Sequence, residues 1–384
     1  MVQPASGGLG PLILPVIDLT RQYRQLQREL DGAVKQVMAN GCFILGPHVE
    51  RFEEEFAAFC HAGFGIGVAT GTDALELALQ AVGVGPGDLV LTPSFTFLST
   101  VDAIRKVGAR PVFLDIDPTT YTLDPEQIPA RLKNIPASAR RKIKAILPVH
   151  LYGHPCDMTA IGQMARRHGW RIIEDCAQAH GARWQGRPVG SFGDIGCFSF
   201  YPTKNLGAYG DAGMAVTSSK QMAQRLRMLR QQGRRDKEHQ VIEGRNSRLD
   251  ELQAAILRVK FKHLSDWTRQ RRALAAHYTK KLHGLPIELP EEAAGAFHVY
   301  HLYAFQTTRR AALQAALARQ SIGSAVHYRI PVHKQPLAHR NQAYPIHLPV
   351  TEQVAKQVLS VPLFPEMTRA EADRVCRALR TFYA

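Results

Sequence analysis

Between residues 65 and 217, short apolar runs alternate with stretches that have the 3.6-residue period of amphipathic helices. The runs fall at 66–70, 89–92, 112–115, 143–150, 171–175, 195–200 and 214–217. Helix-period stretches such as 74–82 and 158–168 lie between most of them. This alternation predicts an α/β fold with a mostly parallel sheet, and such sheets bind ligands at the carboxyl ends of their strands.

The rest of the chain is predicted to be mostly helical, with helices at 221–232, 249–264 and about 266–282. A shorter pattern follows Pro290, with a strand-like stretch at 301–307 and helices near 309–321, 351–359 and 369–382. We therefore expect a large domain over residues 1–260, which begins with a loose tail at 1–15, and a smaller α+β domain over 261–384.

Composition excludes several classes of protein. The chain has 384 residues, of which 45% are hydrophobic and 21% charged, as in ordinary globular proteins. Its apolar runs are far shorter than the roughly 18 residues of a membrane span, and its N-terminus lacks the features of a secretory signal. We expect a cytoplasmic protein with no membrane association. Six cysteines without a C-x-x-C pair, and sixteen histidines without H-E-x-x-H, predict neither a disulfide framework nor a metal site.

Net charge is the unusual feature, with 48 Lys and Arg against 33 Asp and Glu. Much of the excess lies in residues 220–290, where 17 basic residues stand against 7 acidic ones. Solvated faces of amphipathic helices account for most of it. Since no RNP, C2H2 or KH signature is present, we expect no nucleic-acid partner, and a polyanionic metabolite is the remaining specific explanation.

The segment TGTD at residues 70–73 follows an apolar run and opens a helix-period stretch. A glycine at a helix N-terminus leaves backbone N–H groups free to bind a phosphate. Gly71 and Thr72 are therefore candidate phosphate ligands, although a plain helix N-cap explains the same residues.

Two further segments carry candidate chemistry. Asp175 ends the run RIIED, and Gln178 and His180 follow it. A carboxylate at this position can pair with a cationic ring nitrogen, or it can simply cap the next segment. Lys204 lies on a loop rich in Gly just after another apolar run, and Ser199 ends that run. A desolvated lysine there could form a Schiff base, whereas the alternative is an exposed loop lysine.

The segments around Gly71, Asp175 and Lys204 together match the needs of one cofactor. A phosphate site, a carboxylate at a strand end and a loop lysine are what pyridoxal 5′-phosphate (PLP) requires. The carboxylate would keep the ring nitrogen protonated, and the lysine would hold the aldehyde as an imine and later carry protons.

At these residues the chain closely resembles the nucleotide-sugar aminotransferases of the DegT/DnrJ/EryC1/StrS family, which have the PLP-dependent transferase fold type I. The shared motifs include GTDAL at 71–75, PSFTFLST at 93–100, PVHLYG at 148–153, IEDCAQAHG at 173–181, SFYPTKNLG at 199–207, NSRLDELQAA at 246–255 and VHY at 326–328. The resemblance implies a mostly parallel seven-stranded sheet in the large domain.

The resemblance also implies a role for each matching residue. Lys204 would be the imine-forming lysine and Asp175 the partner of the pyridine nitrogen. Gln178 would approach the ring hydroxyl and Phe97 would stack on the ring, while Gly71, Thr72 and Ser199 would bind the phosphate. Asn246 would reach the phosphate in the neighbouring subunit, so that a homodimer shares its active sites. We expect sugar contacts, or alternatively packing roles, for His180, Tyr201 and His327.

The forms SFYPTKNLGA, PVHLYG and AQAHG resemble family members that aminate C3 of a dTDP-3-keto-6-deoxyhexose, giving the dTDP-3-amino-3,6-dideoxyhexose. L-glutamate is the expected amino donor. Lys204 excludes the branch of the family in which a histidine replaces it. The alternatives are amination of a UDP-linked 3-keto sugar at C3 or of a 4-keto nucleotide sugar at C4, and a non-catalytic PLP-binding regulator whose basic helices contact DNA. A Rossmann-type oxidoreductase lacks its glycine fingerprint.

Overall fold

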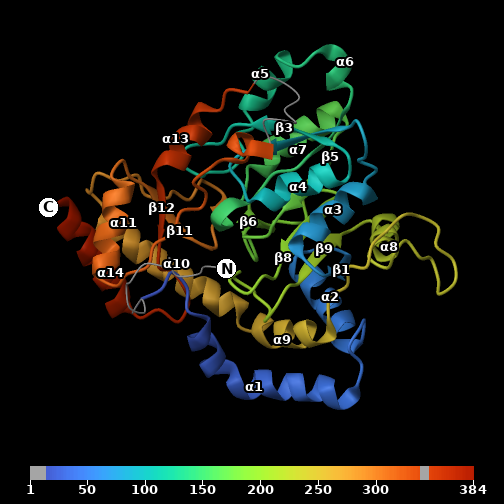
Figure 1. Ribbon diagram of the computed structural model, residues 1–384, viewed down its shortest axis with the longest axis horizontal. Helices are drawn as coiled ribbons and strands as arrows, with labels where there is room; N and C mark the ends of the chain where they lie inside the picture. Colours follow the sequence, from blue (N-terminus) through green and yellow to red (C-terminus); the bar gives the residue numbers. More distant parts are fainter. Residues whose placement is uncertain (1–13, 338–345) are drawn as a thin grey trace.

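The computed structural model describes residues 14–337 and 346–384 of the chain. A seven-stranded sheet lies at its centre in the order β1, β9, β8, β5, β4, β2, β3 (Figure 1). The strands are β1 (Phe64–Val68), β2 (Leu89–Pro93), β3 (Arg110–Leu114), β4 (Ile143–Ile146), β5 (Arg171–Asp175), β8 (Ile195–Ser199) and β9 (Gly213–Thr217). Neighbours from β8 to β3 are parallel, whereas β9 is antiparallel to β8 and β1. The predicted mostly parallel sheet is confirmed.

Different helices cover the two faces of the sheet because side chains alternate along each strand. Cys197 of β8 packs with α3, α4 and α8, whereas the next residue, Phe198, packs with α2 and α9. Toward the other edge, Leu91 of β2 packs with α5 and α7. These helices are α2 (Pro47–Phe59), α3 (Gly71–Ala81), α4 (Leu98–Lys106), α5 (Gln127–Lys133), α7 (Met158–His168), α8 (Lys220–Leu229) and α9 (Glu251–Phe261).

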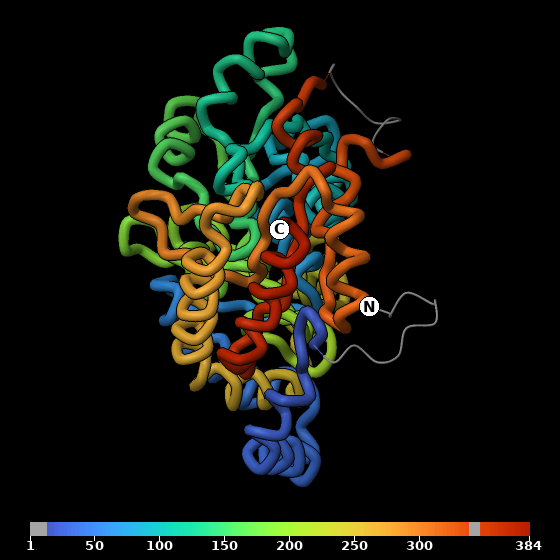
Figure 2. Tube along the Cα trace, turned by 90° about the vertical axis from the view of Figure 1, so that its left-hand side faces the viewer, coloured from blue at the N-terminus to red at the C-terminus, as the bar shows by residue number. Residues whose placement is uncertain are grey.

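The C-terminal part has its own hydrophobic core, to which α10, α11, α14 and the antiparallel pair β11–β12 contribute. Figure 2 shows α14 between α10 and α11. The elements are α10 (Leu264–Leu282), β11 (Tyr303–Gln306), α11 (Arg310–Arg319), α13 (Pro349–Gln357), β12 (Val358–Val361) and α14 (Arg369–Tyr383). The domain boundary at residue 260 stays a prediction; it falls at the end of α9, and Leu264 still packs in the core around α9.

The small elements are α6 (Ala137–Arg140), β6 (Arg183–Trp184), β7 (Arg187–Pro188), β10 (Ala296–Phe297) and the 3-10 turns at Leu151–Gly153 and Val332–Lys334. Within the described ranges, no helix has the length and apolarity needed to cross a membrane.

Two differences from the predicted elements have a clear physical cause. The run 143–150 forms a strand only to Ile146, because Pro148 has no N–H for a sheet ladder. The helix predicted over 351–359 is wrong at its end: Val358 and Leu359 belong to β12 and pair with Gln306 and Phe305. A buried partner strand overrides the helical pattern there, as often happens with short apolar segments.

The N-terminal helix α1 (Leu19–Asn40) lies beside α9 (Figure 1). Its buried face, Leu26 and Leu30, packs on Ile256 and Val259. Residues 1–13 of the predicted loose tail lie outside the described residues. Leu14 is already docked, since its backbone N–H donates to the Ser321 carbonyl at 3.2 Å and its side chain is 1% exposed. The burial of this apolar side chain in the C-terminal core explains the difference.

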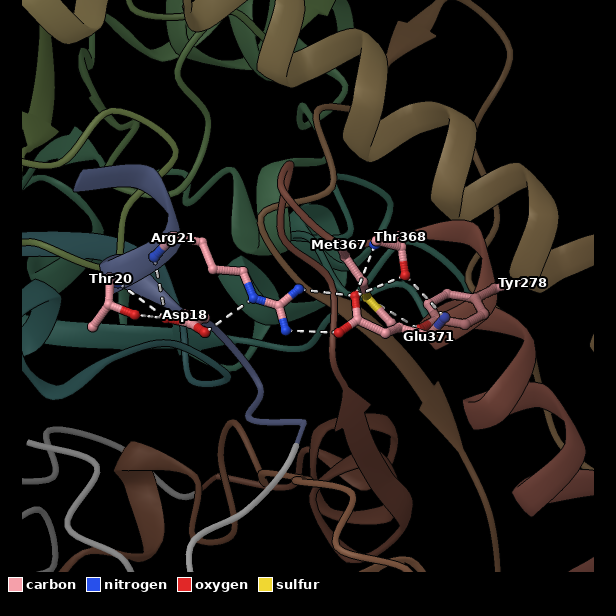
Figure 3. A network of polar contacts seen from close by, with 7 residues as sticks. All are labelled: Asp18, Thr20, Arg21, Tyr278, Met367, Thr368 and Glu371. Carbon is pink, nitrogen blue, oxygen red and sulfur yellow. Dashed lines mark hydrogen bonds and ion pairs between the residues drawn. The ribbon is translucent and has the colours of Figure 1, made fainter. Parts of the chain in front are cut away.

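Arg21 joins the start of α1 to the C-terminal helix (Figure 3). Its guanidinium donates to both carboxylate oxygens of Glu371, at 2.9 and 2.6 Å, and Glu371 also closes a capping box with Thr368. The hydrogen bond from Arg21, followed by those from Thr368, lowers the pKa of Glu371 to about 2.

Replacing Arg21 with Gln is expected to lower the free energy of unfolding by about 1 kcal/mol near neutral pH, because a bidentate, partly buried ion pair is lost. The pKa of Glu371 is lowered by folding, so this stabilisation is complete above its ordinary value of 4.5 and is lost as the pH falls toward 2. Chemical denaturation at pH 7 and pH 3.5 measures both effects.

Arg269→Gln is the matched control, because the Arg269–Asp266 pair is largely exposed at 78% and 58%. Its removal is expected to change the free energy of unfolding by less than about 0.5 kcal/mol. Equal effects of the two substitutions would contradict the special role of Arg21.

Candidate active site

Parallel pairing of β5 with β8 places Asp175 opposite Cys197, so the loops after both strands meet at one edge of the sheet. Asp175 is the last residue of β5, and Ser199 is the last residue of β8. Lys204 lies on the loop that follows Ser199, close enough for its charge to lower the pKa of Asp175. The carboxyl edge, where α/β sheets bind ligands, therefore carries the predicted carboxylate and the predicted lysine.

Asp175 is a buried carboxylate, 5% exposed, that neutral donors hold in place. Thr100 on α4 donates its hydroxyl to Oδ2 at 2.8 Å, and the backbone N–H of Ala177 donates to Oδ1 at 3.1 Å. Because Thr100 donates its only hydroxyl proton, Thr96 must donate to Thr100 across their 2.8 Å contact. Burial raises the pKa of Asp175, against the effect of these hydrogen bonds. Among the described residues, no cation lies within 4.0 Å of it.

Lys204 is held on a short, closed loop. Its backbone N–H donates to the Tyr201 carbonyl at 2.9 Å, and Ala208 N–H donates to the Phe200 carbonyl at 2.7 Å. Lys260, from α9, donates its ammonium to the Gly207 carbonyl. Burial lowers the pKa of Lys204 to about 8, and the Asp175 charge opposes this shift. About a tenth of the amine is therefore unprotonated, and so nucleophilic, at pH 7, against far less for an ordinary lysine.

The N-terminus of α3 packs directly against the end of β8. A Cβ added to Gly71 would lie 2.5 Å from the Ser199 Cβ, so only glycine allows this approach. The Thr70 side chain caps the helix by accepting from Asp73 N–H at 2.9 Å. Thr72 donates its hydroxyl to Ser99 at 2.9 Å. Gly71, Thr72 and Ser199 thus lie together at one helix N-terminus, a place where anions can bind.

Gln178 and Phe97 both contact Tyr328. The Gln178 amide accepts from Tyr152 N–H at 2.8 Å and donates to the Tyr328 hydroxyl at 3.1 Å. Phe97 is the N-cap of α4, is 53% exposed, and has its ring centroid 5.9 Å from that of Tyr328. The expected partner of the ring hydroxyl and the expected stacking residue are therefore adjacent to the same tyrosine.

The three residues expected to contact sugar occupy different environments. His180 is fully buried, with its ring centroid 5.5 Å from those of Phe198 and Phe200, and this placement favours its packing role. His327 is partly buried and shares a 3.2 Å hydrogen bond between Nδ1 and the Ser360 hydroxyl. Burial and the Lys204 charge lower the pKa of both rings, to about 3 for His180 and about 4 for His327, so both are neutral. Tyr201 is 38% exposed on the lysine loop.

Asn246 is exposed and follows Arg245, whose side chain reaches back to α3. Ser247, on its other side, donates its hydroxyl to Asp73 at 2.8 Å. Asn246 therefore projects from a segment that is anchored on both sides, and its side chain is free to meet a second molecule.

Within the part of the chain that the structure describes, one cluster of potential metal ligands lies next to Asp175, formed by His150, Glu174 and Cys176. Glu174 already accepts the N–H groups of Gly190, Phe192 and Gly193 and a hydrogen bond from His150 Nε2. His150 Nδ1 accepts from Cys156 N–H at 3.0 Å. Burial raises the pKa of the Cys176 thiol well above its usual value. With its lone pairs engaged, this cluster anchors the 190–193 loop rather than offering a metal site.

The sequence alone assigned no role to four residues of the site, Thr100, Tyr152, Asn205 and Tyr328. Asn205 tethers the lysine loop to the C-terminal part through the Val299 carbonyl at 3.2 Å and His301 Nδ1 at 3.1 Å. All four fall within the motifs at 93–100, 148–153, 199–207 and 326–328, which pointed to the segments but not to the partners of these side chains.

Residues 24–380 match the sequence profile of the DegT/DnrJ/EryC1/StrS aminotransferase family. The chain is 45% identical over 369 residues to a dTDP-3-amino-3,4,6-trideoxy-alpha-D-glucose transaminase of Streptomyces venezuelae, covering 96% of this chain and 95% of that protein. It is 45% identical to a pleiotropic regulatory protein of Geobacillus stearothermophilus, covering 96% and 98%. It is 44% identical to a UDP-N-acetyl-3-dehydro-alpha-D-glucosamine 3-aminotransferase of Acidithiobacillus ferrooxidans, covering 96% and 97%.

Among solved structures, the fold is similar to that of DesV from S. venezuelae, with a TM-score of 0.92 and 44% sequence identity. The similarity covers 97% of this chain and 99% of DesV. The whole described architecture, and not the central sheet alone, is therefore shared.

Proposed function

The chain belongs to the DegT/DnrJ/EryC1/StrS aminotransferase family, and from this premise we propose that it uses PLP to aminate C3 of a dTDP-3-keto-6-deoxyhexose. L-glutamate is the proposed amino donor, and the product is the dTDP-3-amino-3,6-dideoxyhexose. The observation that carries the proposal is that Lys204 and the buried Asp175 lie at one edge of the sheet, near enough for their charges to interact, where the N-terminus of α3 packs on β8.

The residues of the site fit PLP. Asp175 is a buried carboxylate without a cationic partner within 4.0 Å among the described residues, and such a charge is costly unless a cation pairs with it. Gly71 lets the first turn of α3 pack against Ser199 without a side chain between them, and the backbone N–H groups of this turn can donate to a phosphate. The lowered pKa of Lys204 supplies a reactive amine at the same edge of the sheet.

PLP, when bound, supplies a ring that stores the electron pair released as a proton leaves the substrate carbon. Asp175, oriented by Thr100 and the Ala177 N–H, would hold the proton on the ring nitrogen. Lys204 would hold the aldehyde carbon, and its Nζ, once free, would take up and return the migrating proton. Phe97 would cover the ring, and the Gln178 amide, which also donates to Tyr328, would approach the ring hydroxyl.

We further propose a homodimer with shared sites, in which Asn246 of the partner subunit contacts the phosphate. Its exposure on a well-anchored segment supports this role. Tyr201 and His327 are the proposed sugar contacts, because both flank Lys204. The neutral imidazole of His327 suits hydrogen bonding to a sugar hydroxyl.

The relatives include enzymes of dTDP-sugars and UDP-sugars at nearly equal identity, so the choice of dTDP rests on the PVHLYG and AQAHG segments. A reactive lysine next to a buried carboxylate supports catalysis rather than the purely regulatory alternative.

A substrate panel tests the proposal. The protein is loaded with pyridoxamine 5′-phosphate (PMP), mixed with dTDP-3-keto, dTDP-4-keto and UDP-3-keto sugars, and followed by absorbance and by mass spectrometry of the amino sugar. The dTDP-3-keto-6-deoxyhexose is expected to react fastest, by about 10-fold or more over the others. A reaction with 4-keto sugars alone would overturn the C3 assignment, and one with UDP-sugars alone the nucleotide assignment. PLP binding without any turnover would favour the regulator.

A further inference from the structure

Two carboxylates lie at the end of α3 where the cofactor phosphate is proposed to bind. Asp73 is in the first turn, and Glu76 is one turn further along and only 2% exposed. A phosphate with two negative charges is repelled by such neighbours. In addition, an acidic side chain in the first turn is itself attracted to the positive end of the helix, so it competes with a bound anion.

Arg245 engages both carboxylates at once. One guanidinium nitrogen donates to Asp73 Oδ1 at 2.7 Å, and the other donates to Glu76. Ser247 holds the second oxygen of Asp73 at 2.8 Å, while its own hydroxyl accepts from Ala69 N–H at 3.1 Å. The Asp73 carboxylate is thus turned toward the segment at 245–247. Meanwhile, Asp73 N–H is bound by the Thr70 side chain, which leaves the N–H groups of Gly71 and Thr72 for a ligand.

The backbone around Arg245 is held in place. Arg245 N–H donates to the Leu229 carbonyl at 2.9 Å, and the Arg245 carbonyl accepts from Gln232 N–H at 2.8 Å. Lys106, the other cation near this pair, is 54% exposed and lies 4.0 Å from Glu76. Arg245 is therefore the cation that the fold presents to both carboxylates through hydrogen bonds.

We propose that Arg245 is a positioning residue for phosphate binding, which neutralises Asp73 and Glu76 and withdraws Asp73 from the N-terminus of α3. The proposal rests on the proposed function, since it takes the phosphate of PLP or PMP as the anion. It predicts an effect specific to ligands that carry a phosphate.

Arg245→Gln tests this, with PMP and pyridoxamine as a matched pair of ligands that differ only in the phosphate. Dissociation constants are measured by fluorescence titration at constant ionic strength. The PMP constant is expected to rise roughly tenfold, whereas that of pyridoxamine stays unchanged. An equal rise for both ligands indicates a merely structural role and overturns the proposal, as does an unchanged PMP constant.

Two further variants keep the test decisive if Arg245→Gln folds poorly. Asp73→Asn retains Arg245 and is expected to bind PMP at least as tightly as the wild type; weaker binding would overturn the proposal. Asp73→Asn combined with Arg245→Gln is expected to recover most of the lost affinity. A wild-type protein that binds neither PLP nor PMP contradicts the proposed function itself, whereas intact wild-type binding without phosphate-specific effects contradicts only the role of Arg245.

Discussion

Lys204→Ala is expected to lose the visible absorbance of lysine-bound PLP and to reduce amino transfer by about 10³-fold or more. Alanine offers neither the nucleophile that holds the cofactor nor the base that moves the proton. The structure supports this assignment because burial keeps the pKa of Lys204 near 8, so that the free amine is available near neutral pH. Absorbance spectra and initial rates with saturating PLP measure both losses.

Lys262→Ala is the matched control, because Lys262 is an exposed lysine at the end of α9. Its spectrum and rate are expected to equal those of the wild type. If Lys204→Ala turned over at a rate near that of the wild type, Lys204 would not be the proton carrier.

Asp175→Asn is expected to lower the rate by about 10²–10³-fold while leaving PLP attached to Lys204. An amide keeps the size of the side chain and can still accept from Ala177 N–H, but it cannot hold a proton on the ring nitrogen as an anion does. In the cofactor-free protein, the pKa of Lys204 is expected to fall further below 8, because the Asp175 charge is what opposes the effect of burial.

Single-turnover kinetics with PMP-loaded Asp175→Asn separates an effect on substrate binding from an effect on the chemical step, since the two are measured independently. Thr100→Val is the graded control. It removes the hydroxyl donor to Asp175 but keeps the carboxylate, so a smaller loss of about tenfold is expected. A rate in Asp175→Asn close to that of the wild type would contradict the pairing of Asp175 with the ring nitrogen.

Hydrophobic periodicity predicted the elements whose own residues form a clear apolar run or a clear amphipathic repeat. The strand Arg171–Asp175 and the helix Met158–His168 have the bounds that the sequence predicts, because each is a clean apolar run or an amphipathic repeat. The helix α1 was not predicted, since its apolar stripe is narrow and its burial depends on α9. Val358 and Leu359 were placed in a helix because their pairing with β11 is a contact about fifty residues distant along the chain.

The residues of the candidate site also fall into two groups, those recognisable from local sequence and those that depend on distant partners. Asp175, Ser199 and Lys204 could be chosen as candidates from the sequence because each stands at or just after an apolar run, where a parallel sheet places its ligand edge. Thr100 and Arg245 were not assigned roles, because their importance depends on partners that are distant in sequence, Asp175 and Asp73. A motif flags a segment, whereas hydrogen-bond partners of this kind emerge only from the folded chain.

The most direct test of the account is the position of the covalent bond between the protein and PLP. The protein is incubated with PLP, reduced with borohydride, digested and mapped by mass spectrometry. The account predicts one modified residue, Lys204. Lys260 is the main alternative site of modification, because burial lowers its pKa to about 7. Its ammonium, however, donates to the Gly207 carbonyl and is therefore not available to the cofactor. Modification at Lys260, at exposed lysines only, or at no lysine would contradict the central claim.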